Sequence, residues 1–236
     1  MHDNTEILQR KVAQPDAQAA PESLTCRIYA RLRADILAGR LEPGRKLKIE
    51  ELRKSYGVGA SPIREALSHL ASDHLVERLD QRGFRVAKVS GEEFNELRMT
   101  RCWLEERALR ESIAHGGPDW EERIVLAAYR LSCLPWSKSD NQYVVNGEWE
   151  ILHKAFHMAL ISACGSAILL RFCDQLYDQN IRYRVLSNNA AFHKRDSNAE
   201  HEAIKEATLA RDADHAVERL LAHYSQTGSY LVGRFD

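Results

Sequence analysis

Four histidines in the C-terminal two thirds of the chain have the side chains and the spacing for a metal site. His153 and His157 are four residues apart in a stretch with helical periodicity, so both imidazoles project from one helix face. His201 lies near the start of the following pair of helices, and His223 lies in the last helix. Imidazoles from three helices suit Zn²⁺, with Ni²⁺ or Mn²⁺ as alternatives. Spacing alone also allows histidines that are only packed or solvated.

A second stretch, Gly57–Leu75, has the pattern of a helix-turn-helix. Ser61 is a candidate helix cap, and Pro62 suits the first helical position because no partner is needed there for a backbone N–H. One apolar face has the helical spacing i, i+3, i+4, i+7 and consists of Ile63, Ala66, Leu67 and Leu70. Upstream, residues 49–56 outline a helix of two turns, and Gly57–Gly59 forms the turn between the two helices.

The residues after this second helix predict a wing. Leu75–Leu79 alternates like a strand, residues 80–83 have turn composition, and Phe84–Val86 is a returning strand. A helix-turn-helix with such a hairpin is a winged helix, in which Arg64 would reach guanine in the major groove and the wing tip the minor groove. The candidate DNA contacts are Lys48, Ser61, Pro62, Arg64, Ser68, Arg82 and Gly83. A winged helix that only mediates protein interactions is the alternative.

Charge is distributed unevenly along the 236 residues. Residues 23–90 contain 14 Lys and Arg against eight Asp and Glu, whereas the remainder contains 19 against 26. A basic N-terminal part on an acidic body is typical of a DNA-binding module joined to another domain. Five scattered cysteines without C-x-x-C spacing indicate reduced, mostly buried thiols. The absence of a long apolar run or signal peptide predicts a cytoplasmic protein with no membrane partner.

These patterns predict a mainly α protein in three segments. Residues 1–22 form a polar, disordered tail, 23–89 a winged helix-turn-helix with a small β hairpin, and 90–236 an all-helical bundle. The first helix is capped by Ser23 and ends at Gly39. In the bundle we expect helices at 92–114, 119–134, 140–163, 166–186, 197–211 and 213–232, separated at glycines, prolines and the polar stretch 187–189.

The winged-helix segment closely resembles the DNA-binding domain of GntR-family bacterial transcription regulators. The matching pieces are Leu41–Gly44, the Ser-Pro-Ile-Arg-Glu-Ala-Leu run of Ser61–Leu67, and the Arg82-Gly83-Phe84 wing. The resemblance implies that Arg64 contacts DNA. One departure concerns Gly59-Ala60, where the family usually has Ser-Arg, so a second reading arginine is missing and an operator sequence cannot be transferred.

The helical segment resembles the FCD effector domain of the FadR-type branch of that family. The matching motifs are Arg101-x-x-Leu104-Glu105, the run from His153 to Ser166, Glu200-His201-x-x-Ile204 and Ala222-His223. Members with these histidines bind a divalent metal through one aspartate and three histidines, and here His153 replaces the aspartate. Either all four histidines bind the ion, or His153 turns away. Glu150, one turn before His153, is a candidate to orient an imidazole, with solvent exposure as the alternative.

In this branch a small carboxylic acid typically completes the metal's coordination, and Arg101 would anchor it. The alternative for Arg101 is a buried pair with Glu105. Residues 169–184 more weakly resemble a subgroup of carbon-starvation regulators that respond to glutarate, which adds Tyr183 and Arg184 as effector contacts; an aromatic core residue is the alternative for Tyr183.

We therefore expect a homodimeric, non-enzymatic repressor that binds operator DNA and a small organic acid, with an activator as the alternative because the sign of regulation depends on where the operator lies. A metal sensor without an organic effector is a second hypothesis, and a helical metal-dependent hydrolase is a third.

Overall fold

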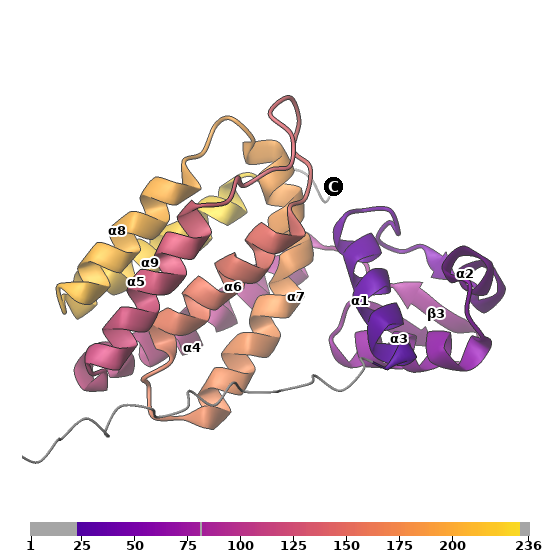
Figure 1. Cartoon of the computed structure of the whole chain (residues 1–236), viewed down its shortest axis with the longest axis horizontal. Helices are drawn as coiled ribbons and strands as arrows, with labels where there is room; N and C mark the ends of the chain where they lie inside the picture. Colours follow the sequence, from indigo (N-terminus) through magenta and orange to yellow (C-terminus); the bar gives the residue numbers. More distant parts are fainter. Residues whose placement is uncertain (1–22, 81, 232–236) are drawn as a thin grey trace, which may run out of the picture.

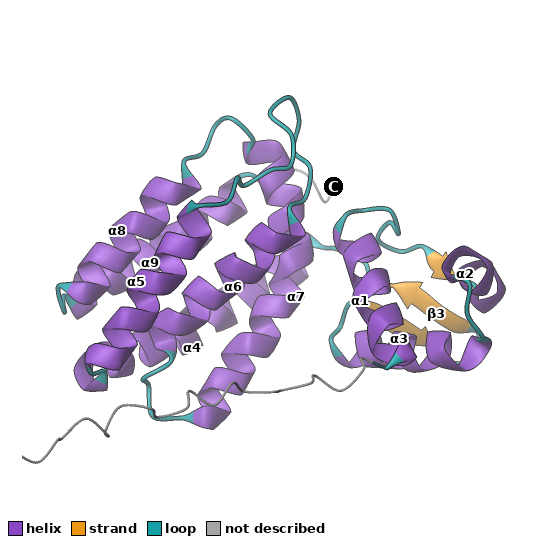
Figure 2. Cartoon of the chain, in the orientation of Figure 1, coloured by secondary structure: helices purple, strands orange, loops and turns teal. Residues whose placement is uncertain are grey.

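The computed structural model describes residues 23–80 and 82–231. Over these residues the chain forms a small winged helix with a three-stranded sheet and a larger bundle of helices (Figures 1 and 2). The predicted mainly α fold class is confirmed. The predicted disordered tail over 1–22 lies outside the described residues.

The winged helix has three helices around one apolar core. Their bounds are Leu24–Leu37 for α1, Ile49–Tyr56 for α2 and Ala60–Ser72 for α3. Ser23 caps α1, because its hydroxyl accepts a hydrogen bond from the backbone N–H of Cys26, as predicted. Gly57 adopts a left-handed conformation (φ 67°) between α2 and α3, which a residue with a Cβ rarely adopts.

The start of α3 differs from the prediction. Gly59, in extended conformation, is the N-cap residue, and Ser61 lies inside the first turn without a capping bond. Glycine is well tolerated as an N-cap, so the helix begins two residues before the predicted Pro62. Pro62 is consequently the third helical residue, where its missing N–H still costs nothing, because the first four N–H groups of a helix have no intrahelical partner.

The wing belongs to a three-stranded antiparallel sheet in the order β1-β3-β2, and not to a simple hairpin. Its strands are Lys46–Leu47 (β1), Val76–Leu79 (β2) and Gly83–Val86 (β3). In the register, Leu47 lies opposite Phe84, and Arg78 lies opposite Phe84 from the other side. The short extended piece predicted before α2 therefore forms the third strand.

The larger part consists of long helices packed side by side (Figure 1). They are α4 (Gly91–His115), α5 (Pro118–Ser132), α6 (Gly147–Ile161), α7 (Ala167–Ala191), α8 (Ser197–Leu209) and α9 (Ala213–Ser229). Their common core includes Trp120, Trp149, Phe156 and Leu220. Within the described residues, no helix is both long and apolar enough to cross a membrane. All five cysteines are unpaired, but only Cys164 and Cys173 are buried.

Two helix boundaries in the bundle were predicted wrongly. Residues 140–146 are not helical, because the Ser137 hydroxyl accepts hydrogen bonds from the N–H groups of Ser139 and Val144, and an isolated bridge joins Ser137 to Val145. Helix α7, in contrast, continues through the polar residues 187–189. The Ser187 hydroxyl is satisfied there by the carbonyl of Thr227 at 2.8 Å, so a polar residue does not end the helix.

Helix α7 also connects the bundle to the winged helix (Figure 1). Tyr177 and Ile181 belong to the same apolar cluster as the core of the winged helix. The Arg182 guanidinium donates to the carbonyl of His74, at the end of α3, and also to Glu93 of α4. These contacts place the winged helix directly against a helix of the bundle.

Candidate metal centre and nucleic-acid interface

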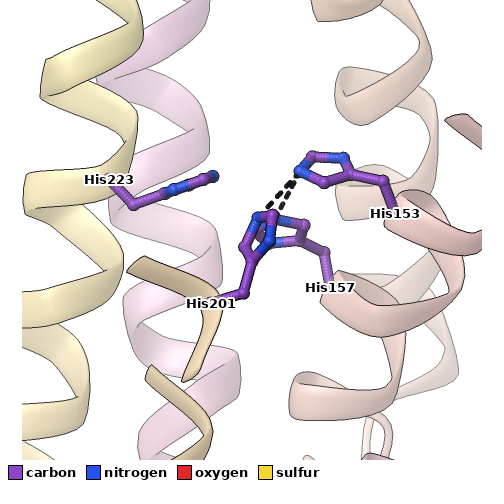
Figure 3. Close-up of side chains that lie close together, drawn as sticks. All are labelled: His153, His157, His201 and His223. Atoms are coloured by element: carbon purple, nitrogen blue, oxygen red, sulfur yellow. Dashed lines mark hydrogen bonds between the residues drawn. The ribbon is translucent and has the colours of Figure 1, made fainter. Parts of the chain in front are cut away.

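The four predicted histidines converge inside the bundle. His153 and His157 project from neighbouring turns of α6, His201 comes from the first turns of α8, and His223 from α9 (Figure 3). All four side chains are buried, with at most 5% exposed. Each offers one ring nitrogen to a common point, and these nitrogens all lie within 4.8 Å of one another. The structure therefore brings together the residues that the spacing suggested.

Two nitrogen–nitrogen distances inside the cluster are close to those expected around a tetrahedral ion. Nε2 of His153 lies 3.1 Å from Nε2 of His201 and 3.2 Å from Nε2 of His157 (Figure 3). Around an ion with Zn–N bonds of about 2.0–2.1 Å, neighbouring nitrogens are about 3.3 Å apart. These two distances are thus close to those around a tetrahedral ion, and the remaining distances between ligand nitrogens are within 4.8 Å.

In His223 and His157 the opposite ring nitrogen has a partner that favours a proton on Nδ1. Glu200 accepts a hydrogen bond from Nδ1 of His223 at 2.7 Å. The Tyr224 hydroxyl donates its proton to Glu105, so its oxygen accepts from Nδ1 of His157 at 3.1 Å. A neutral imidazole protonated at Nδ1 has its lone pair on Nε2. At least two lone pairs therefore point into the cluster, an arrangement that a cation would stabilise.

Burial keeps these imidazoles neutral. It lowers the pKa of His153, His157 and His201 well below the usual value for histidine, and neighbouring charged groups contribute. The pKa of His223 is lowered to about 4, mainly by burial, although Glu200 opposes the shift. Metal ions bind the neutral ring, so the cluster is in its ligand form at neutral pH.

Glu200 is an ionised carboxylate next to the cluster. Burial alone would raise its pKa, but hydrogen bonds from Arg195 and His223 outweigh burial and lower the pKa to about 2. Arg195 binds both carboxylate oxygens, at 2.8 and 2.6 Å. The carboxylate is therefore ionised and held in one orientation, which is the usual arrangement behind a metal-binding histidine.

Aromatic and apolar side chains complete the walls. The Trp149 ring stacks on His153 at 4.5 Å between centroids, and Phe156 meets His201 edge-on at 5.3 Å. Nδ1 of His201 is buried without a hydrogen-bond partner among the described residues. The donor set, its fixed lone pairs and this surrounding shell fit a divalent metal ion.

The predicted effector contacts separate in the structure. Arg101 forms a buried ion pair with Glu105 and stacks over the Tyr224 ring, so the alternative proposed for Arg101 is what the structure shows. Arg184 is also buried and paired, with Glu150. Tyr183 is not near the cluster: its hydroxyl donates to Glu93, and its ring packs with Phe94.

The surroundings of Arg101 leave little room. A cavity of about 10 Å³ lies between Arg101, Phe94, Asn180 and Thr227, which is the lower limit for one water molecule. A ligand at Arg101 would therefore need side chains to move. Glu150 binds Arg184 instead of an imidazole, so neither role considered for it, imidazole partner or exposed carboxylate, is seen.

Sequence reasoning missed four residues that form hydrogen bonds with the histidines, and one of them is Arg195, which donates to the His223 carbonyl at 3.0 Å. Glu200 and Tyr224 are described above, and the Tyr177 hydroxyl lies 2.5 Å from Nδ1 of His153. Glu200 directly precedes His201 and Tyr224 directly follows His223. Acidic and hydroxyl side chains beside candidate ligands were the available signal, but the partner of each is on another helix.

The predicted DNA contacts lie on α2, α3 and the wing. Arg64 is exposed on α3, and no carboxylate pairs with it among the described residues. Ser61, Pro62 and Ser68 share that helix, and Ser61 is exposed. Lys48 is exposed and pairs with Glu51 at 2.8 Å. Arg82, in the turn before β3, and Gly83, the first residue of β3, are both exposed, and φ is 92° at Gly83.

Comparisons with known proteins agree with both parts of the fold. Residues 24–86 match the family described as bacterial regulatory proteins of the gntR family, and residues 96–226 match the FCD domain. The chain is 41% identical to an uncharacterized HTH-type transcriptional regulator, BphR, of Paraburkholderia xenovorans, over 93% of this chain and 89% of that protein. It is 35% identical to the HTH-type transcriptional repressor GlaR of Escherichia coli, over 83% of this chain and 90% of that one.

Solved structures share the fold at lower sequence identity. Escherichia coli McbR/YncC superposes with a TM-score of 0.67 at 18% identity, covering 91% of this chain and 99% of that chain. A putative GntR regulator of Rhodococcus gives the same TM-score at 21% identity, covering 90% and 99%. With a winged helix, a helical domain and these relatives, the chain belongs to the GntR family of bacterial transcription regulators, in the branch that carries an FCD domain.

Proposed function

We propose that the helical domain binds a divalent metal ion through His153, His157, His201 and His223, and that a small carboxylic acid beside this ion controls operator binding. The observation that carries the proposal is the set of inward-facing lone pairs, which Glu200 and the Tyr224–Glu105 pair hold in place. Zn²⁺ suits four imidazoles best, with Ni²⁺ or Mn²⁺ as alternatives.

The charge balance favours an anionic effector. Arg101 pairs with Glu105, Arg184 with Glu150, and Arg195 with Glu200, so the ionised side chains around the cluster cancel one another. Four neutral imidazoles leave both charges of a divalent ion uncompensated in a buried site, which is costly. A dicarboxylic acid would neutralise the ion, and its carboxylate oxygen is an accepted zinc ligand.

Two buried guanidinium groups, those of Arg101 and Arg184, would bind such an acid. Nη2 of Arg101 and Nε of Arg184 have no hydrogen bond among the described residues, although Nη2 of Arg101 lies 2.8 Å from Glu105 as an ion pair. Both arginines already bind an internal carboxylate. The effector would therefore enter by displacing Glu105 or Glu150.

Helix α7 provides a route from this site to DNA. Its Tyr177 contacts His153 and also packs in the core of the winged helix. The next residue, Asp178, pairs with Lys154 of α6 at 2.9 Å and with Arg33 of α1 at 3.3 Å. A shift of His153 and Lys154 would be transmitted through these two residues to α1, which is how occupancy of the site would change operator binding.

At the DNA end, Arg64 would contact a guanine in the major groove, and Arg82 and Gly83 would approach the minor groove. Further DNA contacts along α2 and α3 would come from Lys48, Ser61, Pro62 and Ser68.

A homodimer would place two winged helices on a pseudo-palindromic operator. The E. coli relative named as a repressor supports repression, and we propose that the acid relieves it. We place the protein in the cytoplasm, with residues 23–89 and 90–236 as its two domains.

A second function has a specific observation in its favour. Because the cavity beside Arg101 is so small and both arginines are paired, the ion itself could be the signal, with no organic effector. Operator affinity separates the two functions. We would measure it by fluorescence anisotropy on metal-loaded protein, on protein stripped by a chelator, and on loaded protein with a panel of mono- and dicarboxylic acids.

We expect at least one acid to weaken operator binding of the loaded protein and to have no effect on stripped protein. If stripping abolishes DNA binding and no acid alters it, the metal sensor is correct. If the protein takes up no metal, both functions fail.

A further inference from the structure

Arg78 places a guanidinium against Ser68 of α3, one helical turn from Arg64. Its Nη2 donates a hydrogen bond to the Ser68 hydroxyl at 3.0 Å, although Arg78 itself comes from strand β2. Ser68 is one helical turn beyond Arg64 on the same helix. Building on the proposed contact of Arg64 with guanine, we propose that Arg78 is a specificity-determining residue that contacts an operator base pair about two steps from the one contacted by Arg64.

The sheet holds Arg78 in this position. Arg78 lies opposite Phe84 in the register of β2 and β3, so the two side chains lie on the same face of the sheet. That face packs on α3, because the Phe84 ring belongs to the same apolar cluster as Ile63 and Leu67. The guanidinium carbon is 5.7 Å from the centre of the Phe84 ring, within the range of a cation–π interaction. The ring and the Ser68 hydroxyl thus orient Arg78 from two sides.

Arg78 has no carboxylate partner among the described residues and leaves most of its N–H donors without a partner there. Several arginines of the winged helix pair with carboxylates: Arg33 with Asp178, Arg40 with Asp35, Arg53 with Glu50, and Arg85 with Glu77. Among the described residues, Arg78 has no such partner. Its hydrogen-bond partner is a neutral hydroxyl, which uses one of five N–H donors. An oriented guanidinium with free donors is suited to the O6 and N7 acceptors of guanine.

The spacing of the two arginines predicts which bases they contact. Four residues of an α-helix span about 6 Å along its axis, whereas successive base pairs are about 3.4 Å apart. Arg64 and the Ser68-bound Arg78 should therefore reach base pairs about two steps apart. Loss of either arginine should relax one position of the operator and leave the other unchanged.

The test begins with the full-length protein and a pool of random-sequence DNA duplexes. The wild type selects its preferred site, and single base-pair changes in that site are then measured by fluorescence anisotropy for Arg78→Ala, Arg78→Lys, Arg64→Ala and Ser68→Ala. We expect Arg78→Ala to lose roughly 5- to 150-fold discrimination at one base pair. Arg78→Lys should not restore it, because lysine lacks the bidentate fork. Ser68→Ala should lose less base discrimination than Arg78→Ala, at the same base pair.

Arg40→Ala is the matched control, because it removes an exposed arginine of the same domain that already pairs with a carboxylate. It should leave all base preferences unchanged. A uniform loss of affinity in Arg78→Ala, with a smaller salt dependence, would make Arg78 a phosphate contact and overturn the proposal. Unchanged binding would overturn it as well. If Arg78→Ala does not fold, as judged by circular dichroism, the base preferences of Arg78→Lys and Ser68→Ala still test the proposal. A wild type that enriches no duplex would contradict DNA binding itself.

Discussion

Replacing Glu200 with glutamine tests whether the orientation of His223 matters for the metal centre. In the structure the ionised carboxylate accepts from Nδ1 of His223 at 2.7 Å and is itself held by Arg195. The glutamine side chain would be neutral and could present its amide N–H₂ to the ring, which would favour the tautomer with the proton on Nε2. Loss of such a partner typically weakens metal affinity 10- to 100-fold, or about 1.4–2.7 kcal/mol.

Zinc affinity would be measured by competition with a chromophoric chelator at neutral pH, on protein shown to be folded by circular dichroism. Glu202→Gln is the control, because Glu202 lies on the same helix but is 52% exposed and pairs with Lys205. We expect Glu202→Gln to match the wild type and His223→Ala to lose more affinity than Glu200→Gln. A Glu200→Gln variant within about twofold of the wild type would refute the assignment of the inward lone pair on His223.

Further predictions concern stability, measured by urea unfolding. Ser23→Ala should lower the free energy of unfolding by about 1 kcal/mol, because Ser23 caps α1, whereas Ser61→Ala should change it by less than about 0.5 kcal/mol; equal losses would contradict this. Removing Glu150 by Glu150→Ala should cost about 3–5 kcal/mol, because Arg184 would remain buried and unpaired; a loss below about 1 kcal/mol would argue against that burial. Metal-free protein should lose stability as the pH falls from 6.5 toward 4. The pKa of His223 is lowered on folding from 6.5 to about 4, so the unfolded chain takes up protons first and about 3 kcal/mol is at stake; a flat profile would contradict the neutral cluster.

The sequence alone determined the parts of this protein that depend on local patterns. The helical spacing of Ile63, Ala66, Leu67 and Leu70 predicted the buried face of α3, and all four are fully buried. The same periodicity put His153 and His157 on one face of a helix, where the structure has them. These predictions succeed because neighbouring residues on one helix turn have a fixed geometry, whatever the rest of the chain does.

Helix ends were less predictable from the sequence, because polar side chains at a helix end can form hydrogen bonds with several alternative partners. Ser61 had the composition of a cap, but Gly59 has that position. The polar residues near 187 predicted the end of a helix, but the helix continues because Ser187 donates to a carbonyl of α9. At Gly59 a competing local conformation decided where the helix begins. At Ser187 a hydrogen-bond partner distant in the sequence decided that the helix continues.

Only the tertiary structure decided which charges surround the histidines. Arg184 and Glu150 are 34 residues apart, and His223 and Glu200 are 23 apart, so no local pattern pairs them. Burial makes each unpaired charge costly. The packing of α6 against α7 gives Arg184 its carboxylate, whereas Arg101 and Arg195 pair with Glu105 and Glu200, only four and five residues away. The sequence supplied four histidines with suitable spacing. The packing of α6, α8 and α9 turned them into one site, and α7 placed that site in contact with the winged helix.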